Sequence, residues 1–283
     1  MKALVAAMAV MALPQTSGPT FRVDVERVQI DVSVMRAGRP VSGLTGDDFL
    51  VTDNGANQTV ESVQLEDLPV SVQLVLDTSD SVSGSRLQHL IEAGEGLISA
   101  LTDSDQAGLI TFSDAIDVKV PMTRDLPAVK RAIRAVTGDG STSLRDALQL
   151  AIEMSPPQGT RLMVLVFTDG DDTTSWLSNA DIIDSARRVG VVTHFVQIKG
   201  VSDARAQLLD GIAEATGGRV WSASSERDLT PLFTSALEEM RARYRLVYTP
   251  RQRSTPGWHD LRISLKSGRA DINARAGYFV HSP

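Results

Sequence analysis

The stretch VSVQLVLDTSDS, residues 70–81, decides the fold of this chain. Its first seven residues form a largely apolar run, which predicts a strand that is buried on both faces. Asp77 and hydroxyl side chains follow at once. A second such run, Leu162–Phe167, is followed by Thr168-Asp169-Gly170. Ligands bind beyond the carboxyl ends of the strands of an open parallel sheet, so we expect Asp77 and Asp169 to lie together at that edge.

Residues 70–243 alternate between strand and helix patterns. This alternation predicts an α/β fold, with a doubly wound, mostly parallel sheet that helices cover on both faces. The expected further strands are Gly108–Phe112, Ile116–Val120, Val191–Ile198 and Val220–Trp221. The expected helices carry apolar residues at helical spacing within 87–101, 126–136, 144–152, 182–189, 208–215 and Leu229–Arg243.

The segments on either side of this region have β patterns. Residues 18–69 alternate apolar and polar positions around turn signals such as Asp53-Asn54-Gly55, and residues 244–283 return to short strands. Neither flank has enough strands for a stable sandwich of its own. We therefore expect the two flanks to pack together as one small Ig-like β-sandwich, into which the α/β domain is inserted.

Composition excludes several classes of protein. The chain has 283 residues and a net charge of -7, and no basic patch is visible, which argues against nucleic acid as a partner. It has no cysteine, so disulfides, thiolate metal sites and a cysteine nucleophile are excluded. The four histidines are scattered without metal-ligand spacing and are interpreted as surface or core residues.

The first 17 residues have the pattern of a secretory signal peptide. Met1-Lys2 gives a charged start, an apolar run extends to Leu13, and small and polar residues follow. The apolar run is shorter than the roughly 20 residues that span a bilayer, and nothing later is long enough to anchor the mature protein. We expect export to the periplasm or the extracellular space, without stable insertion in a membrane.

Oxygen ligands from three loops are expected to meet at the carboxyl edge of the sheet. The first loop supplies Asp77, Ser79 and Ser81, the second supplies Thr142 in Gly-Ser-Thr-Ser-Leu, and the third supplies Asp169. Each residue alone fits a helix cap or a turn. Together, two carboxylates and three hydroxyls form a site for a hard divalent cation, Mg²⁺ or Mn²⁺, with Ca²⁺ possible.

This set of residues resembles the von Willebrand factor type A (VWA) domain. The matching pattern is D-x-S-x-S at residues 77–81, a Thr before a helix at Thr142, and Thr-Asp-Gly at 168–170, within about residues 70–243. The resemblance implies a metal-ion-dependent adhesion site. Carried onto this chain, Ser79 and Ser81 would be direct ligands. Thr142 would bind directly or through water, and Asp77 and Asp169 would act largely through water and hydrogen bonds.

The function that the resemblance implies is metal-bridged adhesion and not catalysis. A protein partner would offer an acidic side chain to the open position of the cation. In the family the last helix can shift on binding, so we expect the site to be coupled to the sandwich through Leu229–Arg243. One departure is Ser141, where many relatives have Gly. Another is the added charge of Asp171-Asp172, which would disfavour acidic partners.

The flanks also resemble an exported bacterial group of VWA-related proteins. The matching segments are Val28–Val32, Arg39-Pro40-Val41 with Gly43-Leu44-Thr45, Asp48-Phe49 and, at the end, Gly277-Tyr278-Phe279. With them the resemblance covers nearly the whole chain. It implies the architecture and does not identify a ligand.

Two other functions remain open at this stage. One is a structural scaffold of the same fold that binds no metal. The other is a Mg²⁺-dependent phosphatase, since Asp169-Gly170-Asp171-Asp172-Thr173 fits D-x-D-x-T, with Asp169 as nucleophile and Asp171 as acid/base. Two further expectations concern single side chains. Trp176 is expected to pack against its loop, and Arg241, Arg243 and Arg245 are interpreted as a solvated helix end.

Overall fold

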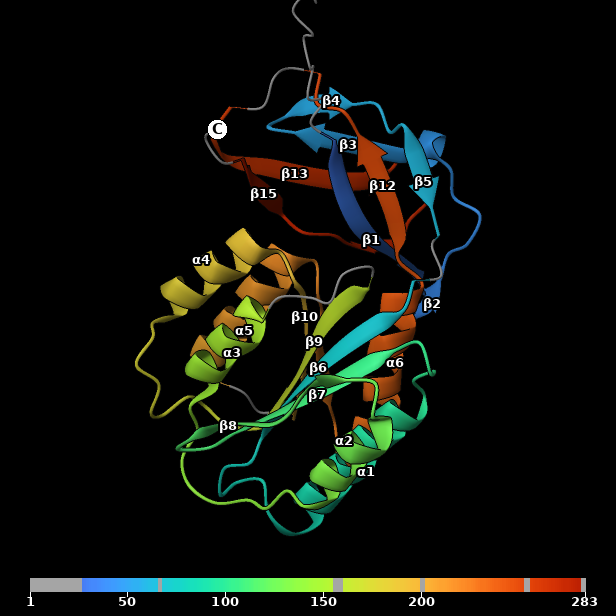
Figure 1. The fold of residues 1–283 in the computed structure, drawn as a ribbon. Helices are drawn as coiled ribbons and strands as arrows, with labels where there is room; N and C mark the ends of the chain where they lie inside the picture. Colours follow the sequence, from blue (N-terminus) through green and yellow to red (C-terminus); the bar gives the residue numbers. More distant parts are fainter. Residues whose placement is uncertain (1–26, 66–67, 155–159, 199–201, 252–254, 281–283) are drawn as a thin grey trace, which may run out of the picture.

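The computed structural model describes residues 27–65, 68–154, 160–198, 202–251 and 255–280. The expected signal peptide, residues 1–17, lies outside these ranges. The molecule is divided into two parts along its long axis. A β-sandwich occupies one end, and an α/β unit with helices on both faces of a sheet occupies the other (Figure 1). Among the described residues, no helix is both long and apolar enough to cross a membrane.

The α/β unit is built on a six-stranded sheet in the order β11-β10-β9-β6-β7-β8. All neighbouring pairs are parallel except β7 and β8, which are antiparallel. This is the doubly wound, mostly parallel sheet expected from the sequence. Its strands are β6 (Val70–Asp77), β7 (Gln106–Phe112), β8 (Ile116–Thr123), β9 (Arg161–Thr168), β10 (Val192–Ile198) and β11 (Val220–Ala223).

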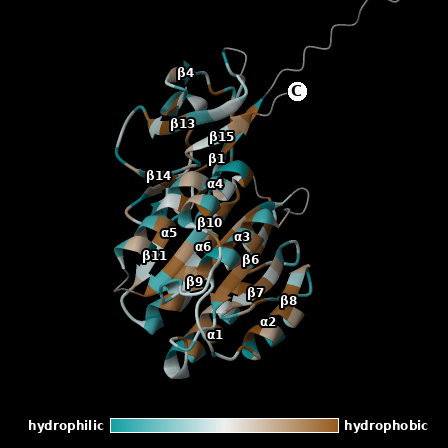
Figure 2. Cartoon of the chain, turned by 90° about the vertical axis from the view of Figure 1, so that its left-hand side faces the viewer, coloured by the Kyte–Doolittle hydropathy of each residue, from teal (hydrophilic) through white to brown (hydrophobic). Residues whose placement is uncertain are grey.

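Helices cover both faces of the sheet and enclose two apolar cores. Every residue of the two central strands β6 and β9 is buried, which explains why their sequences do not alternate. The strands are brown between the helices in Figure 2. One face is covered by α1 (Gly84–Ser99), α2 (Leu126–Arg134) and α6 (Leu229–Arg241). The other face is covered by α3 (Leu144–Glu153), α4 (Asn179–Val189) and α5 (Asp203–Thr216).

The two flanks of the chain form one sandwich, as the sequence predicts. β1 of the N-terminal flank lies between β14 and β12 of the C-terminal flank, and β3 pairs with β13. One sheet has the order β14-β1-β12-β5 with β2 paired to β1, and the other has the order β15-β13-β3-β4. The strands are β1 (Val28–Arg36), β2 (Arg39–Pro40), β3 (Phe49–Asp53), β4 (Ala56–Gln58), β5 (Ser62–Gln64), β12 (Tyr244–Tyr248), β13 (Gly257–Leu265), β14 (Asp271–Asn273) and β15 (Gly277–Val280).

A buried carboxylate joins the two sheets of the sandwich. Asp53, at the end of β3, accepts hydrogen bonds from the hydroxyls of Tyr248 and Tyr278, each at 2.8 Å. Its other oxygen lies 2.8 Å from Nδ1 of His259. Tyr248 belongs to one sheet, and the other three residues belong to the opposite one. A single polar group therefore connects strands from both ends of the chain.

The end of α6 differs from the sequence expectation. Arg243 is fully buried and not solvated: its Nη2 donates to the carbonyl of Gly217 at 2.6 Å and to Glu239 at 3.0 Å. Arg241 pairs with Asp105 at 2.7 Å, and Arg245 lies 3.3 Å from Asp31 of the sandwich. The expectation was wrong for Arg243, because it lies at the junction of the two units, where packing removes its side chain from water, whereas Arg241 and Arg245 stay partly exposed.

A buried histidine near the same junction makes the stability of the protein depend on pH. His194 of β10 is fully buried, and its Nδ1 accepts a hydrogen bond from the backbone N–H of Arg219. Burial, together with the charges of Arg243 and Arg219, holds the pKa of His194 well below its usual range. His194 therefore takes up a proton near pH 6.5 in the unfolded chain but not in the folded chain. The stabilisation that comes from neutral His194 in the folded chain is fully present above that pH and is lost as the pH falls.

As the pH is lowered from 6.5, we expect the free energy of unfolding to decrease by up to about 1.4 kcal/mol per pH unit because of this one residue. Urea unfolding of the wild type and of His194→Gln at several pH values measures the slope. The variant should lack this contribution. An identical slope in both proteins would contradict the assignment.

Candidate functional site

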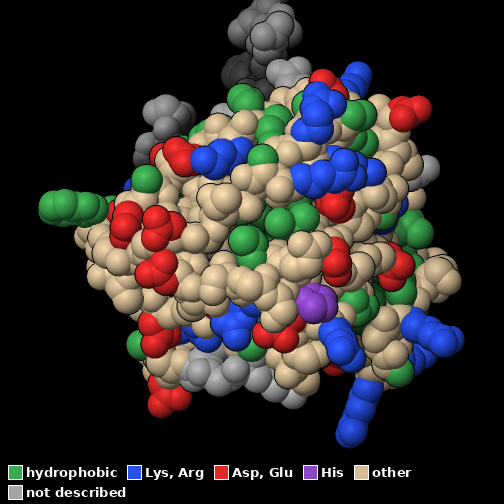
Figure 3. Space-filling view, turned by 90° about the horizontal axis from the view of Figure 1, so that it is seen from below, with side chains coloured by type: hydrophobic (Ala, Val, Ile, Leu, Met, Phe, Trp, Pro, Cys, Tyr) green, Lys and Arg blue, Asp and Glu red, His purple; other side chains and the backbone are tan. Residues whose placement is uncertain are grey.

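The site is built at the carboxyl edge of the sheet, at the end of the molecule away from the sandwich (Figure 1). β6 ends at Asp77, and the loop 78–83 follows. β9 ends at Thr168, and the loop 169–177 follows; the loop 137–143 leads into α3. The end of the molecule seen from below carries acidic and basic side chains side by side (Figure 3). No large surface of one sign is visible there.

Buried hydrogen bonds position the first loop. Asp77 is fully buried, and its Oδ1 accepts from the backbone N–H of Ser79 at 3.0 Å and from the Ser79 hydroxyl at 2.6 Å. Its Oδ2 accepts from Thr168 Oγ1 at 2.8 Å, which ties the first loop to the end of β9. The sequence did not single out Thr168 for this role, although it precedes Asp169 directly.

The hydroxyls of the first loop lead to the second carboxylate. Ser79 Oγ and Ser81 Oγ are 3.1 Å apart, and Ser81 Oγ donates to Asp169 Oδ1 at 2.7 Å. The side chain of Asp169 is 1% exposed. The structure thus places the four residues Asp77, Ser79, Ser81 and Asp169 in one continuous hydrogen-bonded chain.

Thr142 lies at the same point. A Cβ built on Gly170 would be 3.6 Å from Thr142 Oγ1 and 3.7 Å from Ser81 Oγ, so the two hydroxyls flank the space over this glycine. Thr142 itself is held by Thr173, whose hydroxyl accepts from the Thr142 N–H at 3.0 Å and whose N–H donates to the Thr142 carbonyl at 2.9 Å. The structure brings all five sequence-predicted residues together.

The second loop is fixed against the first through the backbone. Asp80 N–H donates to the Gly140 carbonyl at 2.9 Å, Asp139 N–H donates to the Thr78 carbonyl at 2.8 Å, and the Asp80 carboxylate accepts from Gly140 N–H at 3.0 Å. Gly138 approaches the first loop so closely that a Cβ there would lie 2.3 Å from the Val82 carbonyl oxygen. The glycine-rich sequence before Thr142 therefore permits a direct loop-to-loop contact.

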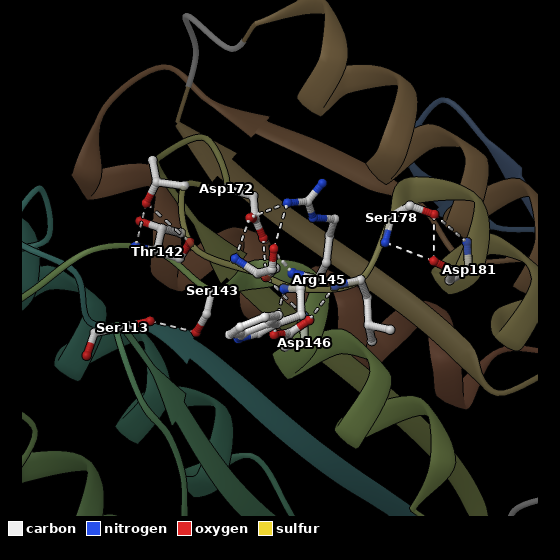
Figure 4. Close-up of polar contacts among 12 residues, drawn as sticks. Ser113, Thr142, Ser143, Arg145, Asp146, Asp172, Ser178 and Asp181 are labelled. Atoms are coloured by element: carbon white, nitrogen blue, oxygen red, sulfur yellow. Dashed lines mark hydrogen bonds and ion pairs between the residues drawn. The ribbon is translucent and has the colours of Figure 1, made fainter.

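The third loop is fastened to the start of α3. Asp172 accepts from the backbone N–H and the guanidinium of Arg145, each at 2.8 Å, and also from Ser175 (Figure 4). Asp146 accepts from the backbone N–H groups of Trp176 and Leu177, each at 3.1 Å. The contacts of Arg145 and Asp146 with this loop join residues about 30 positions apart, so no local sequence pattern predicted them.

The negative charge that Asp171 and Asp172 add beside the site has cationic partners. Asp172 pairs with Arg145, and Asp171 accepts from Ser202 Oγ at 2.7 Å and lies 3.9 Å from Arg205 Nε. Ser141, the other departure, is exposed, and its N–H donates to Asp114 at 2.9 Å. The two carboxylates of Asp171 and Asp172 are thus engaged within the chain, which weakens the expected repulsion of an acidic partner.

Trp176 is 96% exposed, so the expectation that it packs against its loop was wrong. Its neighbours are the reason. The N–H groups of residues 175–177 are all bonded to Asp172 or Asp146, and Leu177 packs against the core. This backbone geometry turns the intervening indole out into solvent. Tryptophan is among the residue types that carry most of the binding energy in protein–protein interfaces.

Because the indole has almost no contacts in the folded chain, Trp176→Ala should leave the free energy of unfolding within about 0.5 kcal/mol of wild type. Urea denaturation followed by circular dichroism measures the change. A loss of 2 kcal/mol or more, on the order of that for a buried side chain, would show that Trp176 is packed in solution.

The oxygen atoms fit a hard cation. In the described part of the chain, no group of three or more acidic or histidine side chains is placed to hold a metal ion, so a cation site here depends on hydroxyl ligands. Burial raises the pKa of Asp77 above its usual range, and the carboxylate of Asp169 adds to this effect, while hydrogen bonds from Ser79 and Thr168 oppose it. A cation would relieve the crowding of the two buried carboxylates.

This fold, with hydroxyls and two carboxylates at the carboxyl edge of its sheet, defines a doubly wound binding domain. The family model for the von Willebrand factor type A domain matches residues 71–235, and the chain belongs to this family. Such domains commonly act as adhesion or protein-interaction modules.

Similar proteins include inter-alpha-trypsin inhibitor heavy chain H4 of Bos taurus, which is 24% identical over 168 residues. That match covers 54% of this chain and 18% of the heavy chain, so this chain spans less than a fifth of the length of that relative.

Two solved structures show the fold. A von Willebrand factor type A protein from Catenulispora acidiphila has a TM-score of 0.52 at 14% identity, over 92% of this chain and 76% of that one. Proximal thread matrix protein 1 from the mussel byssus has a TM-score of 0.52 at 18% identity, over 61% of this chain and 48% of that one. At these identities the likeness concerns the fold alone.

Proposed function

We propose that this chain is an exported, metal-dependent protein-binding module and not an enzyme. Asp77, Ser79, Ser81, Thr142 and Asp169 would hold a divalent cation, Mg²⁺ or Mn²⁺ in the first instance, at the carboxyl edge of the VWA sheet. The observation that carries this proposal is the meeting of three loops at one point, with the hydroxyls of Ser81 and Thr142 on either side of Gly170.

Each residue has a role that its contacts support. Ser79, Ser81 and Thr142 supply neutral hydroxyl oxygens, while Asp77 and Asp169 orient the two serines by accepting their hydrogen bonds. Once bound, the cation would offer an electron-poor centre with an open position for a carboxylate oxygen of a protein partner. The exposed indole of Trp176, on the same loop as Asp169, would add an apolar contact to that partner.

The domain organisation that we propose follows the elements. Residues 70–243 form the VWA domain, and residues 18–69 and 244–283 supply the two halves of the sandwich. The β1–β12 and β3–β13 pairings support this division. Residues 1–17 would direct export as a signal peptide.

Calorimetric titration of the mature protein with Mg²⁺ and Mn²⁺ tests the cation site. We expect binding by the wild type. Asp171→Asn should keep that affinity within a few-fold, because Asp171 faces Ser202 and Arg205. Loss of binding in Asp171→Asn would instead favour the phosphatase alternative, and no binding by the wild type would favour the metal-free scaffold.

Selection of a phage-displayed random peptide library on the protein in Mn²⁺ tests the nature of the partner. We expect clones that share an Asp or Glu and that are released by EDTA. Selection against Trp176→Ala should yield weaker clones. Clones without acidic residues, or clones that EDTA does not release, would contradict the proposed role of the cation.

A further inference from the structure

We propose that Arg86 is a built-in counter-ion of the metal site, which holds Asp169 in the metal-free protein and must leave that carboxylate when a cation binds. This inference rests on the proposed function, since it concerns the same site. Arg86 was not among the residues that the sequence singled out. It is the third residue of α1, five positions after Ser81.

The guanidinium of Arg86 lies inside the site. Its Nη1 donates to Asp169 Oδ2 and, at 3.1 Å, to the carbonyl of Ser81. Because the other oxygen of Asp169 accepts from Ser81 Oγ, both oxygens of this carboxylate are engaged. The positive guanidinium beside one oxygen of Asp169 lowers the attraction of the site for a metal cation and occupies a carboxylate that the metal needs.

Arg86 also has a second acidic partner. Its Nε lies 3.5 Å from Glu226 Oε1, and the side chain of Glu226 is 33% exposed, against 1% for Asp169. Glu226 begins the short helix η2 (Glu226–Asp228), which leads directly into α6. When the Arg86 guanidinium leaves Asp169, it can therefore pair with the Glu226 carboxylate, which lies beside it and is more solvated. The pair Arg86–Glu226 also joins the metal site to the start of the last helix.

Two substitutions should change metal affinity in opposite directions. Arg86→Gln removes the competing charge and keeps a polar side chain, so it should tighten Mg²⁺ and Mn²⁺ binding about tenfold. Glu226→Gln removes the alternative partner, which leaves Arg86 on Asp169, so it should weaken binding several-fold. In the Arg86→Gln background, Glu226→Gln should have almost no further effect, because its effect acts through Arg86.

Matched controls separate this effect from net charge. Arg86→Lys keeps the charge and should bind metal with nearly wild-type affinity. Arg134→Gln removes a positive charge at the end of α2, where Arg134 pairs with Glu95 of α1 away from the site, and should leave affinity unchanged. Arg86 is part exposed, so the variants are expected to fold; thermal unfolding verifies this.

The titrations give distinct outcomes for the two proposals. Metal binding by the wild type with unchanged affinity in Arg86→Gln overturns the counter-ion and leaves the proposed function standing. Binding by Arg86→Gln but not by the wild type supports the counter-ion and overturns metal binding by the wild type. No binding by either protein overturns both proposals.

Hydrogen exchange provides a second readout. On addition of Mn²⁺, exchange at the start of α6 should change in the wild type and remain constant in Arg86→Gln. Unchanged exchange across Leu229–Tyr248 in the wild type would contradict a link between the site and the last helix.

Discussion

The double substitution Ser79→Ala/Ser81→Ala should lower Mg²⁺ and Mn²⁺ affinity by about 100-fold or more, to the point where calorimetry detects no binding. Loss of a single partner that only orients a ligand already costs about 10- to 100-fold in metal affinity. Here two proposed ligands are lost together. The hydrogen bonds from the Ser79 hydroxyl to Asp77 and from the Ser81 hydroxyl to Asp169 are lost as well, so each carboxylate loses one of the groups that orient it.

Ser83→Ala is the matched control for this double variant. Ser83 lies two residues further along the same loop, at the start of α1, and its side chain makes no capping hydrogen bond there. We expect its metal affinity to equal that of the wild type. Binding of Mg²⁺ or Mn²⁺ by Ser79→Ala/Ser81→Ala with the affinity of the wild type would contradict the proposed ligand set.

The second large effect is on stability. Glu239→Ala should lower the free energy of unfolding by about 3–5 kcal/mol, since removal of one partner leaves a buried charge without compensation. Glu239 is 1% exposed; its Oε1 accepts from Arg243 at 3.0 Å, and its Oε2 lies 3.3 Å from Arg219 Nε. Arg219 reaches solvent at its edge, but Arg243 is 0% exposed and cannot be rehydrated without opening the junction.

Urea denaturation of paired variants measures this effect. Glu95→Ala removes a carboxylate from the partly exposed pair with Arg134 and should cost less than about 1 kcal/mol. The double variant Glu239→Leu/Arg243→Met should recover part of the loss, because apolar side chains of similar size need no counter-charge. A cost below 1 kcal/mol for Glu239→Ala would mean that Arg243 finds another partner or water in solution.

Much of the site was predictable from local sequence. The runs before Asp77 and Asp169 are apolar because both strands are buried on both faces, and buried strands of one parallel sheet end at one edge. The glycines before Thr142 signal a tight loop, and the structure shows the close backbone contact that they permit. The strand-and-helix order followed from periodicity alone, and the pairing of the two β flanks followed from the number of strands that a sandwich needs.

The partners of charged side chains were not predictable in the same way. Arg86 was overlooked because a basic residue in the first turn of a helix gives no signal of its own, and only the fold brings Asp169 and Glu226 to it. Arg243 has the sequence pattern of a solvated helix end, yet it is buried, because the sandwich packs against that end.

The sequence by itself determined the doubly wound sheet, the insertion into a sandwich and the identity of the oxygen-bearing residues at the sheet edge. Those features depend on hydrophobic periodicity and on short motifs, which act over a few residues. Only the tertiary structure decided which charges meet, that Arg86 holds Asp169, that Glu239 and Arg243 are enclosed, and that Trp176 faces solvent. Burial and electrostatic pairing depend on segments that are distant in sequence, so no local pattern determines them.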